Sequence, residues 1–256
     1  MRIWKNRGRP VRIEYAYLCH RGNVRDENQD NMILCADEHI VMRNMEQEIA
    51  GAGSCLNSIK CAVFDGMGGM SQGEMASVIA VDVMKESIKD VKVKEADINT
   101  LFQKMNEGID DYRTCNRISN MGTTGVLVIA DHKEFVYGNI GDSRLYHLRK
   151  GKLQQCSVDH TMKQPYTGKR LLIQYLGMDS DYEIEPHIGR QKVECGDEII
   201  LCSDGLTDCV PDEELEKILN NRNHVAVQLQ ELKETVLKRE AQDNISVILC
   251  RWEYER

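Results

Sequence analysis

The sequence predicts an α+β fold in which helices cover antiparallel β-sheets. Three observations lead to this expectation: strand-like apolar runs occur from residue 13 to residue 250, two long helical periodicities lie together in one central block, and short glycine turns join some of the runs. Alternating βαβ units would have spread the helices between the strands, so the segregation favours α+β. No linker, low-complexity segment or repeat interrupts the chain, and we expect one domain, residues 1–256.

Eight runs rich in branched and aromatic residues have strand character. They are 13–19, 31–35, 59–64, 123–130, 134–140, 144–148, 197–203 and 244–250. Short turns containing Gly141 and Gly151 join 134–140 to 144–148 and 144–148 to 152–156. We expect both pairs to form antiparallel hairpins.

Helical periodicity fills the gaps between these runs. Apolar residues spaced i, i+3, i+4 and i+7 predict helices over 76–91, 98–112 and 225–236, and a shorter helix begins near Asp212. Residues 168–177 could form one more helix. The stretch 36–58 has the weakest pattern, and we interpret it as a loop or an irregular hairpin exposed to solvent.

The composition is that of a soluble globular protein, with 41% hydrophobic and 29% charged residues. A net charge of −8 gives a nucleic-acid partner no electrostatic support, whereas an excess of carboxylates suits divalent cations. No apolar run approaches the roughly 20 residues that a membrane span needs. The basic N-terminus, MRIWKNRGRP, precedes no apolar segment and does not resemble a secretory signal.

Ten cysteines are present, but their placement argues against a disulfide scaffold. No C-x-x-C motif occurs, and Cys61, Cys202 and Cys250 lie inside apolar strand-like runs. We expect buried free thiols in a reducing compartment, and therefore a cytoplasmic protein.

Five aspartates mark the ends of five expected core strands. Three of them have a glycine directly beside them in the chain. The five are Asp30, Asp65, Asp142, Asp204 and Asp243. Five ordinary turn residues would give the same pattern, so only the fold can show whether the carboxylates meet.

Such carboxylates, if the fold brings them together, would require cations, because neighbouring carboxylates resist joint ionisation. An all-oxygen ligand set suits Mg²⁺ or Mn²⁺, and no His/Cys pair has the spacing of a zinc site. Gly66 follows Asp65 and has no Cβ, so its carbonyl could approach a metal closely.

Seven short motifs follow one another along the chain: RDENQD (25–30), VFDGMGG (63–69), GTT (122–124), GDSR (141–144), DHT (159–161), CSDGLTD (202–208) and DNIS (243–246). Their order resembles that in metal-dependent serine/threonine protein phosphatases of the PPM type, also called type 2C, and their wording resembles the bacterial branch. A single short motif recurs by chance, whereas seven in order make the resemblance specific. It covers about residues 12–250.

The resemblance implies a four-layer α/β/β/α sandwich of two antiparallel sheets flanked by helices. It implies that Asp65 bridges two Mn²⁺ or Mg²⁺ ions, and that the Gly66 carbonyl, Asp204 and Asp243 complete the protein ligands. Asp142 matches a residue that, with Asp204, can bind a third, weaker metal in bacterial relatives.

Two further roles follow from the same resemblance. Asp30 would hold metal-bound waters, and Arg25 matches the arginine that grips the phosphate, where a bidentate fork suits two phosphate oxygens. Two metals lower the pKa of a bridging water, so that hydroxide can attack the phosphate near neutral pH without a protein nucleophile. The implied activity is hydrolysis of phosphoserine and phosphothreonine in proteins.

This sequence departs from the family pattern at two places. Eukaryotic relatives have a histidine, proposed as the general acid, where this chain has Met67, and the turn containing His160 reads as structural rather than as a substitute. The flap is also short, because only fourteen residues separate Thr161 from Leu176. The short flap bears on substrate choice more than on catalysis.

Two alternatives remain open from sequence: a non-catalytic binding or regulatory module on the same fold, and a phosphatase of a small phosphorylated molecule. The expected partners are phosphorylated proteins, together with a serine/threonine kinase that shares these targets; no nucleic acid or membrane is expected. Family analogy suggests a monomer.

Overall fold

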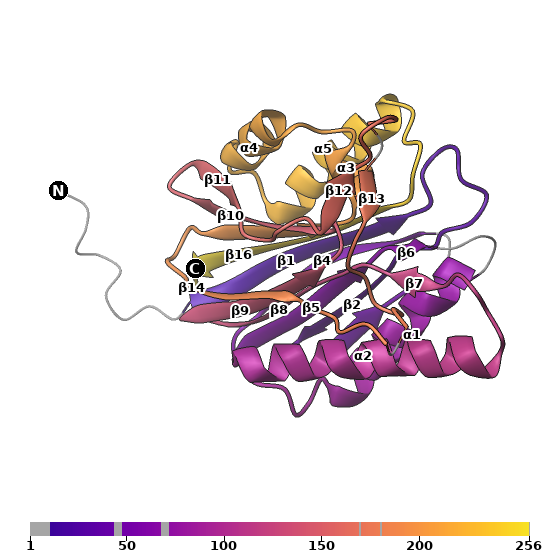
Figure 1. Ribbon diagram of the computed structural model, residues 1–256. Coiled ribbons are helices and arrows are strands. Elements are labelled where there is room, and N and C mark those ends of the chain that lie inside the picture. The colour runs from indigo at the N-terminus through magenta and orange to yellow at the C-terminus, as the bar shows by residue number, and fades with distance from the viewer. Residues whose placement is uncertain (1–10, 44–47, 68–71, 169, 180, 256) are drawn as a thin grey trace.

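Two six-stranded antiparallel sheets pack face to face, and helices cover both outer faces (Figure 1). The computed structural model describes residues 11–43, 48–67, 72–168, 170–179 and 181–255. The expected α/β/β/α sandwich is therefore confirmed. None of the helices in these ranges is long and apolar enough to cross a membrane.

The first sheet, sheet A, contains both ends of the described chain. Its strand order is β11 (Lys152–Gln155), β10 (Arg144–Arg149), β15 (Glu198–Cys202), β16 (Ile245–Tyr254), β1 (Val11–His20) and β4 (Glu48–Cys55). Its outer face is covered by α3 (Asp204–Thr207), α4 (Asp212–Asn220) and α5 (Val225–Lys238). Leu215, Leu232 and Val236 of these helices are buried against Ala16 and Leu249 of the sheet.

The second sheet, sheet B, has the order β14 (His187–Lys192), β9 (Glu134–Ile140), β8 (Gly125–Asp131), β5 (Ser58–Phe64), β2 (Asn31–Ala36) and β3 (His39–Met42). Its outer face packs on α1 (Gln72–Ser87) and α2 (Glu95–Cys115). Two short ribbons complete the fold: β6 (Gly66–Met67) with β7 (Gly122–Thr123), and β12 (Thr161–Lys163) with β13 (Arg170–Leu172).

Between the sheets lies an apolar layer that includes Trp252 and Phe135, whose rings are stacked with centroids 6.2 Å apart. Cys61 and Cys250 are fully buried in this layer, and all ten cysteines are free. The expectation of buried free thiols is therefore confirmed for Cys61, Cys202 and Cys250. Central strands such as β2, β8, β15 and β16 are buried on both faces, because the other sheet covers one face and helices cover the other. This explains their nearly continuous apolar sequences.

One of the two expected hairpins is wrong. β10 and β11 do form a hairpin, but β9 pairs with β8 and β14 in sheet B, whereas β10 pairs with β11 and β15 in sheet A. The connection 141–143, which begins at Gly141 with a φ of +94°, crosses from one sheet to the other. A short glycine turn indicates a change of direction, but it does not indicate which strand becomes the neighbour.

Two other expectations need correction. Residues 168–177 do not form a helix: residues 170–172 are strand β13, because a short apolar run does not distinguish a helix from a strand. The stretch 36–58 contains two strands, β3 in sheet B and β4 in sheet A. Residues 44–47 lie outside the described residues. The sequence of β4, EIAGAGSC, hides its strand character because Gly and Ala have low strand propensity.

Candidate metal centre

Six of the seven predicted site residues line one open cavity of about 920 Å³. They are Arg25, Asp65, Gly66, Asp142, Asp204 and Asp243. The seventh, Asp30, does not line the cavity and is only 1% exposed. The fold thus brings together carboxylates that are up to 178 residues apart in the chain, from Asp65 to Asp243.

The cavity lies where the two sheets end together. Asp65 follows β5 and Asp142 follows β9, both in sheet B. Asp204 follows β15 and begins α3, and Asp243 lies two residues before β16; both strands belong to sheet A. Each carboxylate is therefore carried by the end of a buried strand, and rigid strands hold side chains more precisely than loops do.

The backbone of Asp65 is held by the neighbouring threonines. Its carbonyl accepts hydrogen bonds from the Thr124 amide at 2.9 Å and from Thr123 Oγ1 at 2.8 Å. Its amide donates to Thr124 Oγ1 at 3.2 Å, and that hydroxyl lies 2.6 Å from Ser143 Oγ. The GTT and GDSR motifs thus fix the position of this aspartate.

Two glycines permit close backbone contacts at the cavity. A Cβ on Gly66 would lie 2.2 Å from the Gly73 carbonyl oxygen at the start of α1. A Cβ on Gly205 would lie 1.9 Å from the Asn244 carbonyl oxygen, beside Asp243. The obstacles are backbone atoms, so any side chain at either position would displace the segments that carry the aspartates.

The loop between β1 and β2 is clamped by Asn244. The Asn244 side-chain nitrogen donates to the Arg21 carbonyl at 2.8 Å and to the Glu27 carbonyl at 3.0 Å, and its oxygen accepts from the Gln29 amide at 2.8 Å. This loop carries Arg25, and its position at the cavity is therefore fixed by the residue that follows Asp243.

Asp30 lies at the end of the same loop and faces the protein interior. Its Oδ2 accepts a 2.7 Å hydrogen bond from Ser203, the residue before Asp204. Its Oδ1 is buried without a hydrogen-bond partner in the described chain. A buried carboxylate oxygen without a donor in the described chain suits a bound water or cation.

The clustered carboxylates raise one another's pKa. Burial is the largest cause for Asp65, whose pKa is raised well above its usual range, and repulsion from Asp30, Asp204, Asp243 and Asp142 adds to it. Burial, followed by repulsion from Asp142 and Asp243, raises the pKa of Asp204 to about 7. Divalent cations would offset this repulsion, and oxygen donors suit Mg²⁺ and Mn²⁺. The residues present therefore fit the expected ions.

Arg25 forms an ion pair inside the cavity, because its Nη2 donates to Asp243 Oδ2 at 2.7 Å. As the side chains stand, no three acidic, histidine or cysteine residues of the described chain are arranged to hold an ion. In this arrangement the Asp243 carboxylate is paired with a guanidinium. The ion pair holds Arg25 at the cavity wall.

Met67 and His160, the two residues considered in connection with the general acid, lie in different places. Met67 lines the cavity and has no proton to donate. His160 is not among the lining residues; its Nδ1 accepts a 3.1 Å hydrogen bond from the Gly141 amide. This contact supports the structural interpretation of His160.

Four residues that support the site had no assigned role in the sequence analysis. Thr124, Ser203 and Asn244 lie inside recognised motifs, so their position beside an aspartate was a usable signal. Arg43 lies outside every motif, and the fold places its guanidinium 2.9 Å from the Asn28 carbonyl.

Comparisons with known proteins agree with this geometry. A family model described as Protein phosphatase 2C matches residues 35–250. Serine/threonine phosphatase stp from Listeria monocytogenes serotype 4b is 29% identical over 250 residues, which cover 90% of this chain and 92% of that protein.

Solved structures match over nearly the whole chain. The Mycobacterium tuberculosis serine/threonine phosphatase PstP/Ppp has a TM-score of 0.77 and 27% identity, covering 95% of this chain and 100% of that one. The PstP catalytic domain in complex with two manganese ions has a TM-score of 0.76 and 27% identity, covering 95% and 99%. With a family model that spans most of its length and a fold to match, the chain belongs to the protein phosphatase 2C family.

Proposed function

We propose that the chain is a metal-dependent protein phosphatase that hydrolyses phosphoserine and phosphothreonine at this cavity. The observation that carries the proposal is the convergence of Asp65, Asp142, Asp204 and Asp243 from the ends of both sheets on one open cavity. A cluster of partly buried, mutually repelling carboxylates is unfavourable as a structural element, and perturbed titratable groups in a cavity indicate a functional site.

We assign Asp65, the Gly66 carbonyl, Asp204 and Asp243 as the ligands of two Mn²⁺ or Mg²⁺ ions. Asp142 would serve a third ion, and Asp30, with its unpartnered Oδ1, would orient waters of the centre. When bound, the ions lower the pKa of water, so that hydroxide is available near neutral pH, and offset the charge of the phosphate.

The protein's own groups bind and orient the substrate. Arg25 is half exposed at the cavity wall and can present a planar fork to two phosphate oxygens. The threonines that bond to Asp65 hold its carboxylate on the strand end. No cysteine lines the cavity among the described residues, which supports a mechanism without a thiol nucleophile.

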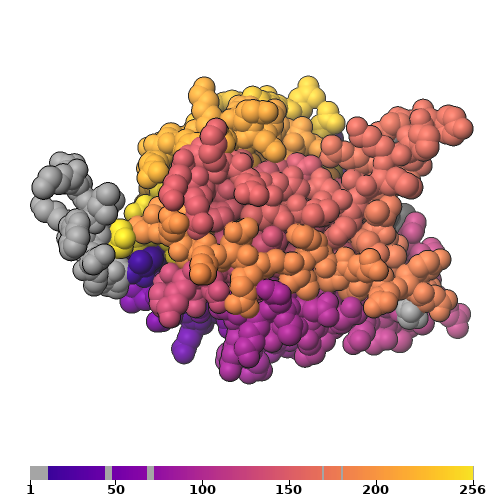
Figure 2. Space-filling view, turned by 60° about the vertical axis from the view of Figure 1, so that its left-hand side comes forward, coloured from indigo at the N-terminus to yellow at the C-terminus, as the bar shows by residue number. Residues whose placement is uncertain are grey.

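A protein substrate is supported by the ribbon β12–β13, which projects from the surface (Figures 1 and 2). Five of the nine large apolar side chains exposed in the described residues lie within 158–173: Val158, Met162, Tyr166, Leu171 and Ile173. Leu172 of the same ribbon lines the cavity. An exposed apolar ribbon beside an open cavity can contact the surface of a protein substrate.

Phosphorylated proteins are therefore the proposed partners, with a kinase that modifies the same targets. The free state of all ten cysteines supports a reducing compartment such as the cytoplasm.

The test is hydrolysis of a phosphothreonine peptide in Mn²⁺ and in EDTA by the wild type, Asp65→Asn and Asp204→Asn. We expect turnover with Mn²⁺ only, and at least a hundredfold loss in both variants. Asp82→Asn changes an exposed carboxylate on α1 and should retain full activity. Turnover in EDTA, or full activity of both cavity variants, would refute the mechanism. A chain that binds Mn²⁺ but hydrolyses no phosphoester would instead be the non-catalytic module.

A further inference from the structure

Arg43 is a fully buried arginine close to the metal centre. It directly follows β3, and its side chain has an exposed fraction of 0%. Its Nη2 donates to the Asn28 carbonyl at 2.9 Å and to Glu74 Oε1 at 2.9 Å. Burying a guanidinium is unfavourable unless its hydrogen bonds are satisfied, so these contacts define where the side chain can lie.

The two partners of Arg43 belong to two different segments, the loop that lines the cavity and helix α1. Asn28 lies in the loop that carries Arg25 and ends at Asp30, and its Oδ1 accepts a hydrogen bond from the Asp30 amide at 3.2 Å. Glu74 lies in the first turn of α1, next to Gly73. Arg43 therefore joins the Asp30 loop to the N-terminal end of α1.

The end of α1 in turn touches the residue after Asp65. A Cβ on Gly66 would lie 2.2 Å from the Gly73 carbonyl oxygen and 2.6 Å from the Gln29 carbonyl oxygen. Ser77 of α1 also donates to the Gln29 carbonyl at 2.7 Å. The Asp30 loop, α1 and the Asp65–Gly66 turn therefore pack against one another. The Arg43 guanidinium joins the first two of these segments through its hydrogen bonds.

We propose that Arg43 is a positioning residue for the metal centre, because it fixes the position of Asp30 relative to the Asp65–Gly66 turn. The inference rests on the proposed function, since it concerns the same site. Arg43 touches neither the substrate nor the proposed ligands; it acts through Asn28, Glu74 and α1.

Electrostatics alone makes the opposite prediction, which allows a clean test. A fixed positive charge near a cation site disfavours cation binding, so its removal would tighten Mn²⁺ binding. Loss of a group that orients the ligands weakens binding, typically by 10- to 100-fold for residues that support metal ligands. The direction of the change therefore distinguishes a positioning role from a simple charge effect.

The experiment is calorimetric titration of Mn²⁺ into the wild type, Arg43→Gln and Arg43→Lys, with thermal unfolding measured in EDTA. We expect Arg43→Gln to weaken the Kd for Mn²⁺ by about tenfold or more. Arg43→Lys should give an intermediate Kd, because an ammonium keeps the charge but lacks the rigid planar guanidinium whose Nη2 bonds both partners. If Arg43→Gln does not fold, Arg43→Lys decides the question by itself. A Kd equal to or tighter than that of the wild type would overturn the proposal.

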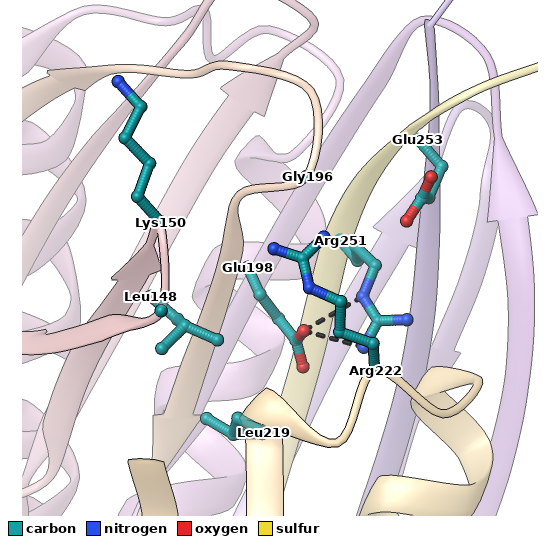
Figure 3. Close-up of a pocket in the computed structure, with 9 residues that line it drawn as sticks. Leu148, Lys150, Gly196, Glu198, Leu219, Arg222, Arg251 and Glu253 are labelled. Carbon is teal, nitrogen blue, oxygen red and sulfur yellow. Dashed lines mark hydrogen bonds and ion pairs between the residues drawn. The ribbon is translucent and has the colours of Figure 1, made fainter. Parts of the chain in front are cut away.

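Arg251→Lys provides the matched control. Arg251 is also a buried arginine paired with a glutamate, Glu198, at 2.8 Å, but it lies near the other end of β16 from Asp243 (Figure 3). Its substitution should lower the unfolding temperature without changing the Kd for Mn²⁺.

Peptide hydrolysis by the wild type tests the proposed function separately. Mn²⁺ binding without hydrolysis would reject that function and leave the Arg43 comparison valid. A wild-type chain that binds no Mn²⁺ would overturn both.

Discussion

The Arg25 guanidinium donates to the Asp243 carboxylate over 2.7 Å, although the two residues are 218 positions apart in the chain. This contact joins the residue proposed to bind phosphate to a residue proposed to bind metal. Both side chains are partly exposed, at 55% and 39%. If Asp243 binds a metal ion as proposed, it would exchange the Arg25 guanidinium for that ion, and Arg25 would then be available for the substrate.

Arg25→Gln should lower the Kd for Mn²⁺ and raise the KM for a phosphorylated peptide. Removing the competing guanidinium should tighten Mn²⁺ binding by up to about fivefold, because exposed ion pairs contribute about 0–1 kcal/mol. The KM for a phosphothreonine peptide should rise by about tenfold or more, because a charge-assisted contact to the phosphate is lost. Calorimetry and steady-state kinetics measure the two effects. A weaker Kd for Mn²⁺ would show that Arg25 does not compete for Asp243.

The strand-end aspartates show how much of the site could be predicted from local sequence. An Asp at the end of an apolar run, in three cases beside a Gly, is a local pattern, and it identified every acidic residue that lines the cavity except Asp26 and Glu27. The expected role of each aspartate came from the resemblance to the phosphatase family, which rests on the order of the motifs. Asp30 was recognised by the same pattern, but only the fold shows it turned inward to Ser203.

The errors involve relations that are not local. The partner sheet of a strand depends on edges formed by distant segments, which is why β9 and β10 were paired wrongly. Arg43 follows a short strand in the least patterned stretch, and no periodicity indicates that its guanidinium is buried. Its importance depends on Asn28 and Glu74, 15 and 31 residues away, meeting at one point.

Without divalent cations, the protein should lose stability as pH rises. Burial and the neighbouring carboxylates raise the pKa of Asp204 to about 7 and that of Asp65 well above its usual range. The folded state then binds more protons than the unfolded state above about pH 4, so the free energy of unfolding falls between about pH 4 and 7. Thermal unfolding in EDTA and in Mn²⁺ from pH 5 to 7.5 measures this.

Mn²⁺ should remove most of that pH dependence, because the bound carboxylates stay ionised. Asp65→Asn should also flatten the profile in EDTA, since it removes the most strongly repelled carboxylate. Identical profiles with and without Mn²⁺ would contradict the assignment of these aspartates as ligands.

Gly66→Ala should damage both the fold and the centre. The new methyl group would lie 2.2 Å from the Gly73 carbonyl oxygen and 2.6 Å from that of Gln29, so backbone must move. We expect the free energy of unfolding to fall by about 1–3 kcal/mol, as for other overpacked sites. Mn²⁺ binding should weaken as well.

Gly108→Ala, inside α2, is the control for Gly66→Ala. Its methyl group would lie 3.3 Å from Ile79 Cγ2, a side-chain atom that can adjust. A gain in helix propensity of about 1 kcal/mol offsets the contact, so stability should stay near that of the wild type. Urea unfolding curves compare the two variants, and equal losses would show that the contact at Gly66 is not special.

The buried pair Glu198–Arg251 provides the last prediction. Glu198 Oε2 accepts from Arg251 Nε at 2.9 Å and Nη2 at 2.8 Å, beside a small cavity of about 20 Å³ (Figure 3). Arg251→Met leaves the Glu198 carboxylate buried without this partner, and such losses reduce the free energy of unfolding by about 3–5 kcal/mol. Arg222 extends toward the pair in Figure 3 and can supply part of the missing charge, which places the expected loss near about 3 kcal/mol.

The double variant Glu198→Leu/Arg251→Met should be more stable than Arg251→Met alone, because it removes the stranded charge. Arg251→Met should also regain stability as the pH falls, since burial raises the pKa of Glu198 even with Arg251 opposing it. Protonation of that carboxyl in the folded state then removes the unpaired charge, so the free energy of unfolding rises toward low pH. Guanidinium unfolding at pH 7 and pH 5 measures both effects. A double variant less stable than the single one would show that the unpaired Glu198 carboxylate does not cause the loss in Arg251→Met.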